Sequence, residues 1–125
     1  MCIRDRYNLA ANSNGVVVDV GQSKGVQELA AQAAANPACV YAVNLEADAI
    51  QAIINSFRNG SPDNVQDVVI VGDDDVIPFF RYSDAEPVAP EDGYSVPLNS
   101  DTEADAALAN DYYLSDCLLY TSRCV

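Results

Sequence analysis

The sequence predicts an α/β fold, in which three strands joined by two crossover helices form half of a doubly wound parallel sheet. Three observations lead to this expectation. β-branched runs without polar alternation suit strands that are covered on both faces. Apolar stripes with helical spacing lie between those runs. Half of the 125 residues are apolar and a fifth are charged, which is the composition of one ordinary globular domain.

The first strand is expected at residues 16–20 (Val-Val-Val-Asp-Val), after an Asn-Gly turn at 14–15. A loop over residues 21–25 leads to the first helix. The apolar stripe of that helix consists of Val26, Leu29, Ala30 and Ala33. The helix should end before the Asn-Pro pair at 36–37, because proline moves the residue before it out of the helical region.

The same order is then repeated. Residues 40–43 (Val-Tyr-Ala-Val) are expected to form the second strand. The second helix should carry its stripe on Ile50, Ile53, Ile54 and Phe57 and end at the Asn-Gly pair 59–60. Phe57 is therefore expected to face the sheet.

Residues 65–71 are expected to form the third strand, with Val69 and Val71 buried beneath the helices. Right-handed crossovers complete a Rossmann-like half-sheet. A long irregular loop is expected at residues 78–99, which contain four prolines. A capping pattern at residues 100–103 (Ser-Asp-Thr-Glu) predicts a short helix that runs through Ala109.

The two ends have a different origin on this interpretation. Residues 1–6 and 117–125 resemble the translation of a sequencing-library adapter, read on both strands. We therefore expect residues 7–116 to be a truncated α/β subdomain between two adapter-derived tails, and the tails carry no weight in the fold argument.

The charge of the chain excludes several functions. Nineteen Asp and Glu oppose six Lys and Arg, so the net charge is −13, and there is no His. A surface of this kind repels nucleic acid and anionic membranes, so neither is expected as a partner. Catalysis by Ser-His-Asp or Cys-His groups lacks its imidazole. Cys39 is the single cysteine of residues 7–116, and we expect a buried, inert thiol on the second strand.

The candidate site lies directly after the third strand, at Gly72, Asp73, Asp74 and Asp75. Ligands of open α/β sheets gather at the carboxyl ends of strands, and three carboxylates there could bind calcium. The alternative is a turn whose carboxylates cap backbone amides and face water. A second acidic series, at Asp101, Glu103 and Asp105, lacks the glycine and terminal Glu of an EF-hand.

Three segments carry a resemblance to a known family. Residues 68–73 (Val-Val-Ile-Val-Gly-Asp), 76–78 (Val-Ile-Pro) and 110–113 (Asn-Asp-Tyr-Tyr) are similar to segments of gingipain-like cysteine peptidases of the caspase-like clan. The resemblance implies two consecutive α/β subdomains, of which the first is non-catalytic and the second carries the catalytic His and Cys.

The present chain resembles the first of these subdomains, so none of its residues is assigned a catalytic role. Its implied partner is the catalytic subdomain of the parent protein, and the loop Gly72, Asp73, Asp74 and Asp75 would shape one wall of the substrate cleft. The implied location is secreted or in the cell envelope, and no cofactor is implied. The alternative function is that of an acidic, doubly wound binding or interaction module that could bind calcium.

Overall fold

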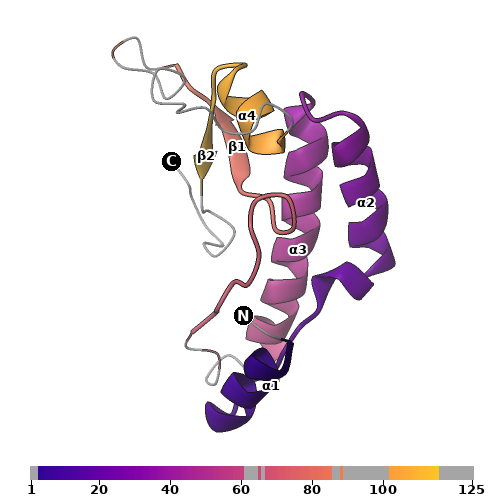
Figure 1. Ribbon diagram of the computed structural model, residues 1–125, viewed down its shortest axis with the longest axis vertical. Helices are drawn as coiled ribbons and strands as arrows, with labels where there is room; N and C mark the ends of the chain where they lie inside the picture. Colours follow the sequence, from indigo (N-terminus) through magenta and orange to yellow (C-terminus); the bar gives the residue numbers. More distant parts are fainter. Residues whose placement is uncertain (1–2, 61–64, 66, 86–87, 89–101, 116–125) are drawn as a thin grey trace.

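The computed structural model describes residues 3–60, 65, 67–85, 88 and 102–115, and it is mostly helical (Figure 1). In chain order the elements are helix α1, the 3-10 turn η1, helices α2 and α3, strand β1, helix α4 and strand β2. Two long helices lie side by side, with the two short strands and α4 near one end of them and α1 near the other (Figure 1).

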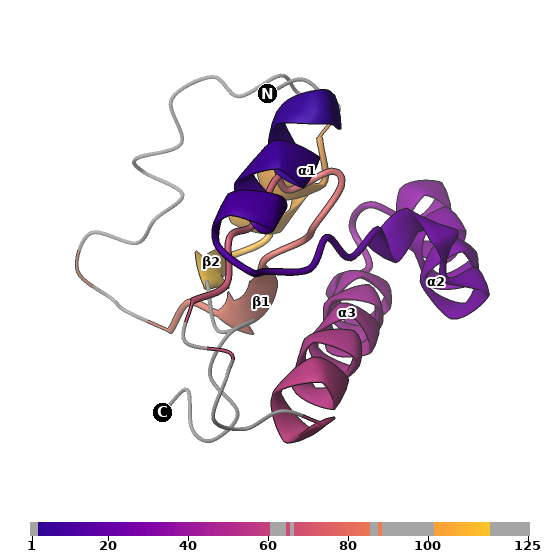
Figure 2. The ribbon, with the colours of Figure 1, turned by 90° about the horizontal axis from the view of Figure 1, so that it is seen from below.

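The helical pair consists of α2 (Lys24–Ala35) and α3 (Val40–Gly60). As predicted, α2 ends before the Asn-Pro pair, and the N–H of Asn36 closes it by donating to the carbonyl of Ala33 (2.9 Å). A tight turn follows, and α3 returns along α2, so that the two helices stay adjacent in both views (Figures 1 and 2).

The core forms between this pair and strand β1 (Phe80–Ser83). Its central cluster is Val26 of α2, Ala47 and Ile50 of α3, and Phe80 of β1. Burying these apolar side chains is the main force that holds β1 against α3, since transfer out of water contributes about 25 cal/mol per Å².

Strand β1 pairs with β2 (Tyr112–Ser115) in an antiparallel ladder that sets Tyr82 opposite Tyr113. Helix α4 (Glu103–Leu108) precedes β2, and its N-cap is Thr102, whose hydroxyl accepts the N–H of Asp105 (3.2 Å). The short helix expected from the capping pattern is therefore present, although the cap is Thr102 and Ser100 lies outside the described residues.

Helix α1 (Ile3–Asn12) lies at the far end of the molecule from β1 and β2 (Figure 1). It ends where Asn14 takes a left-handed conformation (φ 52°) and the N–H of Gly15 donates to the carbonyl of Ala10 (2.7 Å). This is the left-handed C-terminal cap that asparagine and glycine favour. The turn predicted at residues 14–15 is thus present, but it ends a helix.

The predicted parallel sheet is wrong, because the sheet in the described residues has two antiparallel strands, β1 and β2. Residues 16–19 carry no regular structure, and Val20 begins η1 (Val20–Gln22). Residues 40–43 form the first turn of α3, and residues 67–71 run as an open trace toward β1 (Figure 1). The two predicted crossover helices therefore exist as helices but connect no parallel strands.

Residues 40–43 are helical for a physical reason that the short pattern concealed. Val43, Ala47 and Ile50 are spaced by four and three residues, so they extend the apolar stripe of the helix by two turns, and all three are buried. A run of four apolar residues satisfies both strand and helix templates. Packing of the extended stripe against α2 decides in favour of the helix.

Two burial predictions are also wrong. Phe57 is 41% exposed, because α3 is longer than α2 and its C-terminal turns extend past the start of that helix (Figure 1). Val69 and Val71 are 66% and 42% exposed, where burial was predicted. The loop predicted for residues 78–99 contains β1, which pairs with a strand about thirty residues further along the chain.

Among the described residues, no helix combines the length and the apolar character required to cross a membrane.

Candidate functional site

The candidate site is the acidic turn between residue 71 and strand β1. Gly72 opens it with φ 155°, a conformation that side chains rarely adopt, and a Cβ there would lie 3.3 Å from the Cβ of Val76. The carbonyl of Asp73 then accepts the N–H groups of Val76 (3.1 Å) and Ile77 (2.9 Å). The turn therefore has fixed backbone bonds, and glycine is required where it starts.

The three carboxylates of the turn differ in their surroundings. Asp74 forms an ion pair with the guanidinium of Arg81, and its side chain is 13% exposed while that of Arg81 is fully buried. The other oxygen of Asp74 accepts the N–H of Phe79 (2.8 Å). Asp73 and Asp75 are exposed. Asp74 thus fastens the turn to β1, and the two flanking carboxylates face water.

Arg81 has two further attachments. Its Nη1 donates to the carbonyl of Phe79, two residues earlier in the chain. Its backbone is held by the side-chain amide of Asn44 on α3, which accepts the N–H of Arg81 (2.8 Å) and donates to its carbonyl (2.9 Å). Asn44 therefore makes, on one side of β1, the pair of bonds that a neighbouring strand would make.

One polar atom of the Arg81 side chain makes no hydrogen bond among the described residues. Its Nε is buried and has no hydrogen-bond partner in the described part of the chain. A buried guanidinium that makes fewer bonds than its five donors allow contributes less than a fully bonded one. The arrangement holds the turn in place and presents no free cationic group to a ligand.

The calcium hypothesis is not supported by a gathered set of ligands. Asp74 is engaged by Arg81, and in the described residues no three His, Cys, Asp or Glu side chains are placed to share a metal ion. Of the second acidic series, Asp101 lies outside the described residues. Weak calcium binding at the turn stays a prediction, to be tested by a concentration-dependent rise in melting temperature.

Cys39 lies directly before α3 and is exposed, so the prediction of a buried thiol on a strand is wrong. Its carbonyl accepts the N–H groups of Ala42 (2.9 Å) and Val43 (3.3 Å), which begins the helix. The chain contains no imidazole that could take the proton of this thiol.

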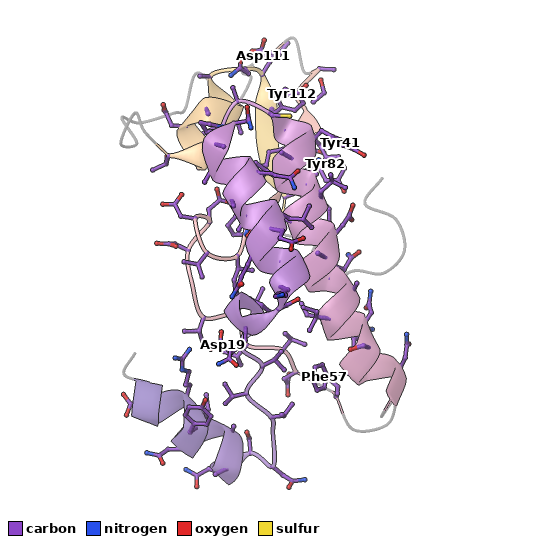
Figure 3. The ribbon with its side chains drawn as sticks, turned by 90° about the vertical axis from the view of Figure 1, so that its right-hand side faces the viewer. Asp19, Tyr41, Phe57, Tyr82, Asp111 and Tyr112 are labelled. Atoms are coloured by element: carbon purple, nitrogen blue, oxygen red, sulfur yellow. The ribbon has the colours of Figure 1, made fainter. Side chains whose placement is uncertain are left out.

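Aromatic side chains gather on the two-stranded sheet. The ring centroids of Phe80 and Tyr82 are 6.2 Å apart, and those of Tyr82 and Tyr113 are 5.8 Å apart. Figure 3 shows Tyr82 at the same end of the molecule as Tyr41, Asp111 and Tyr112. Phe80 and Tyr82 are both on β1, whereas Tyr82 and Tyr113 face each other across the ladder, so the second pair stabilises the pairing of the strands.

The sheet connects the segments that carry the family resemblance through residues 80–84, which follow the first of them. The acidic turn and Pro78 lead directly into β1, while Tyr112 and Tyr113 belong to β2. The strand ladder and a hydrogen bond from the N–H of Asp84 to the carbonyl of Asp111 (2.7 Å) join residues 80–84, which follow the first of these segments, to the second. Asp111 has φ 59°, a left-handed conformation that Asp tolerates.

Sequence reasoning placed the turn but missed the two residues that hold it. The sequence contained some indication that Arg81 could pair with an acid of the turn, because it is one of three basic residues between positions 7 and 116 and follows two aromatic residues. Nothing in the sequence indicated that Asn44 bonds the backbone of Arg81, since this contact depends on the packing of β1 against α3.

Comparisons of the chain with protein-family models, with curated proteins and with solved structures found no match.

Proposed function

We propose that this chain is a non-catalytic part of a gingipain-like cysteine peptidase and supports the catalytic part of the same protein. One observation carries the proposal. The segments at 68–73 and 76–78 lead into β1, and the segment at 110–113 leads into β2, so the ladder between these two strands brings parts of the chain that resemble the family to one small sheet. Segments that pack together in this way are expected to be kept together in a family.

The chemistry of the chain fits a supporting role. A cysteine peptidase needs a thiolate nucleophile and an imidazole that moves its proton. Cys39 has no imidazole anywhere in the chain to serve it. Hydrolysis would therefore depend on groups supplied by the rest of the parent.

The contribution of this part would be mechanical. Asp74, Arg81 and Asn44 fix the acidic turn to β1 and β1 to α3. A rigid turn of this kind can form one wall of a substrate cleft in the complete protein, with Asp73 and Asp75 exposed on it.

The uninterrupted gene and its product test the proposal. We expect the gene to encode a Gly-His-Gly motif and a nucleophilic Cys, and the purified parent to hydrolyse peptides until that Cys is replaced by Ala. A parent without these motifs, or one that folds but cleaves no peptide, would contradict the peptidase assignment.

The supporting role is tested in the same parent with two variants. Asp74→Ala breaks the attachment of the turn, so we expect it to lower peptidase activity at least about tenfold, a change of about 1.4 kcal/mol. Asp75→Ala alters an exposed neighbour and should leave activity within about twofold. Equal activity of the two variants would show that the turn does not support catalysis.

A second candidate is an acidic interaction module without peptidase activity. The observation in its favour is the exposed apolar run at residues 68–71 in a chain of net charge −13. A parent that lacks the catalytic motifs would favour this candidate.

A further inference from the structure

Residues 67–71 (Asp-Val-Val-Ile-Val) have the composition of a strand but no strand partner in the described part of the chain. The four apolar side chains are between 37% and 66% exposed. No backbone N–H or C=O of this segment has a hydrogen bond among the described residues. Unbonded amides between apolar side chains are a template for the addition of another extended segment.

Carboxylates stand at both ends of this segment. Asp67 begins it, and Asp73 and Asp75 follow it. All three are exposed, and no ion pair involves them in the region that the structure describes. Asp74 does not add to this charge, because Arg81 neutralises it.

These charges disfavour a second copy of the chain as the occupant. If two copies paired antiparallel about residues 69 and 70, Asp67 of one copy would lie opposite Gly72 of the other, next to its Asp73. If the two copies paired in parallel and in register, Asp67 of one copy would lie opposite Asp67 of the other. Like charges at such positions destabilise strand pairing, and the net charge of −13 adds to the repulsion.

We propose that residues 67–71 bind an extended segment of another protein, with an apolar centre and Lys or Arg on both sides, as an added β-strand. Backbone hydrogen bonds and apolar contacts supply the affinity. The basic residues of the partner pair with Asp67, Asp73 and Asp75, which sets specificity and speeds association. This inference is independent of the peptidase assignment.

Titration calorimetry of the full chain tests the proposal with a synthetic peptide of alternating valine and threonine between paired lysines. We expect saturable binding that weakens as salt is raised, because the flanking ion pairs are exposed. A matched peptide with glutamates in place of the lysines should bind at least about tenfold more weakly. Equal binding of the two peptides would overturn the proposal.

Two proline variants locate the binding site. Val69→Pro removes one N–H from the segment and should weaken binding of the lysine peptide at least about tenfold. Val88→Pro alters an apolar residue that is exposed outside the segment and should leave binding unchanged. Circular dichroism melts check that both variants fold. Equal affinity of the two variants would place the peptide elsewhere.

Hydrogen exchange distinguishes the other occupants. The amides of residues 67–71 should exchange fast in the free chain and slowly with the lysine peptide. Slow exchange in the free chain at low concentration would mean that the chain covers its own segment. Self-association that Val69→Pro abolishes would assign the segment to a second copy. Either result overturns the proposal.

Discussion

Arg81 has a fully buried side chain whose guanidinium faces the carboxylate of Asp74. A buried charge is tolerated when it is paired and hydrogen-bonded, and costs several kcal/mol when its partner is removed. The bonds of Asn44 to the backbone of Arg81 add a neutral attachment on α3. At the scale of single residues, these three side chains determine how β1 and the acidic turn meet the helices.

The first prediction concerns Asp74. Asp74→Ala leaves the buried guanidinium of Arg81 uncompensated, and we expect a loss of about 3–5 kcal/mol in the free energy of unfolding. Asp73→Ala and Asp75→Ala remove exposed carboxylates from the same turn and should each stay within about 0.5 kcal/mol. Urea unfolding of the three variants measures the difference. A cost for Asp74→Ala no larger than for its neighbours would show that the ion pair does not hold the turn.

At the scale of elements, the pairing of α2 with α3 is the main packing event. The buried positions of α3 follow one stripe, and the stripe loses its cover toward the C-terminal end of the helix. Ile50 is 1% exposed, Ile53 and Ile54 are half-buried, and Phe57 is exposed. Residues of the same apolar stripe therefore contribute differently to the free energy of unfolding, more at Ile50 than at Phe57. Figure 3 shows Phe57 at the end of α3 far from Tyr41.

A second prediction follows for that stripe. Ile50→Ala empties a core position and should cost about 2–5 kcal/mol of unfolding free energy. Phe57→Ala removes a larger side chain, but from a position that is exposed to solvent, and should lower the free energy of unfolding by less than about 1 kcal/mol. Thermal or chemical unfolding of the two variants decides the order. The reverse order would mean that another segment covers Phe57 and that the core extends further along α3.

At the scale of the whole molecule, the described part contains extended apolar segments that are only partly covered. Residues 16–18 and 68–71 are rich in valine and largely exposed. Strands need a neighbour to satisfy their backbone groups and cover their side chains. A chain with such segments is expected to function in contact with other protein, which agrees with both proposed functions.

A third prediction concerns activity of the whole chain. The purified chain should cleave no peptide, because it lacks an imidazole to serve a thiol. Cys39 is exposed and should react with a small thiol reagent in the folded state, where the sequence had predicted protection. Mass spectrometry of the labelled chain and a fluorogenic peptide assay provide the two measurements. Peptide hydrolysis that depends on Cys39 would contradict the supporting role.

The sequence alone determined the features that depend on local chemistry. It predicted the body and end of α2, the C-terminal end of α3, the short helix after residue 100 and the turn at Gly72. Helical stripes, a proline and a glycine with positive φ act over a few residues, so their effect is visible in the pattern. The absence of His likewise limits the chemistry of this chain whatever its fold.

Only the tertiary structure decided which apolar runs became strands and which acid of the turn became paired with a cation. Residues 40–43 joined a helix because α2 offered a surface for a longer stripe, and residues 68–71 found no partner among the described residues. β1 formed in a predicted loop because β2 and Asn44 satisfied its backbone on both sides. Asp74 differs from Asp73 and Asp75 through its ion pair with Arg81 and the N–H that it accepts from Phe79. The strand pairing and the bonds of Asn44 join residues that are distant in the chain, and the Asp74 ion pair depends on how the turn folds back on β1, so local sequence carries little information about any of them.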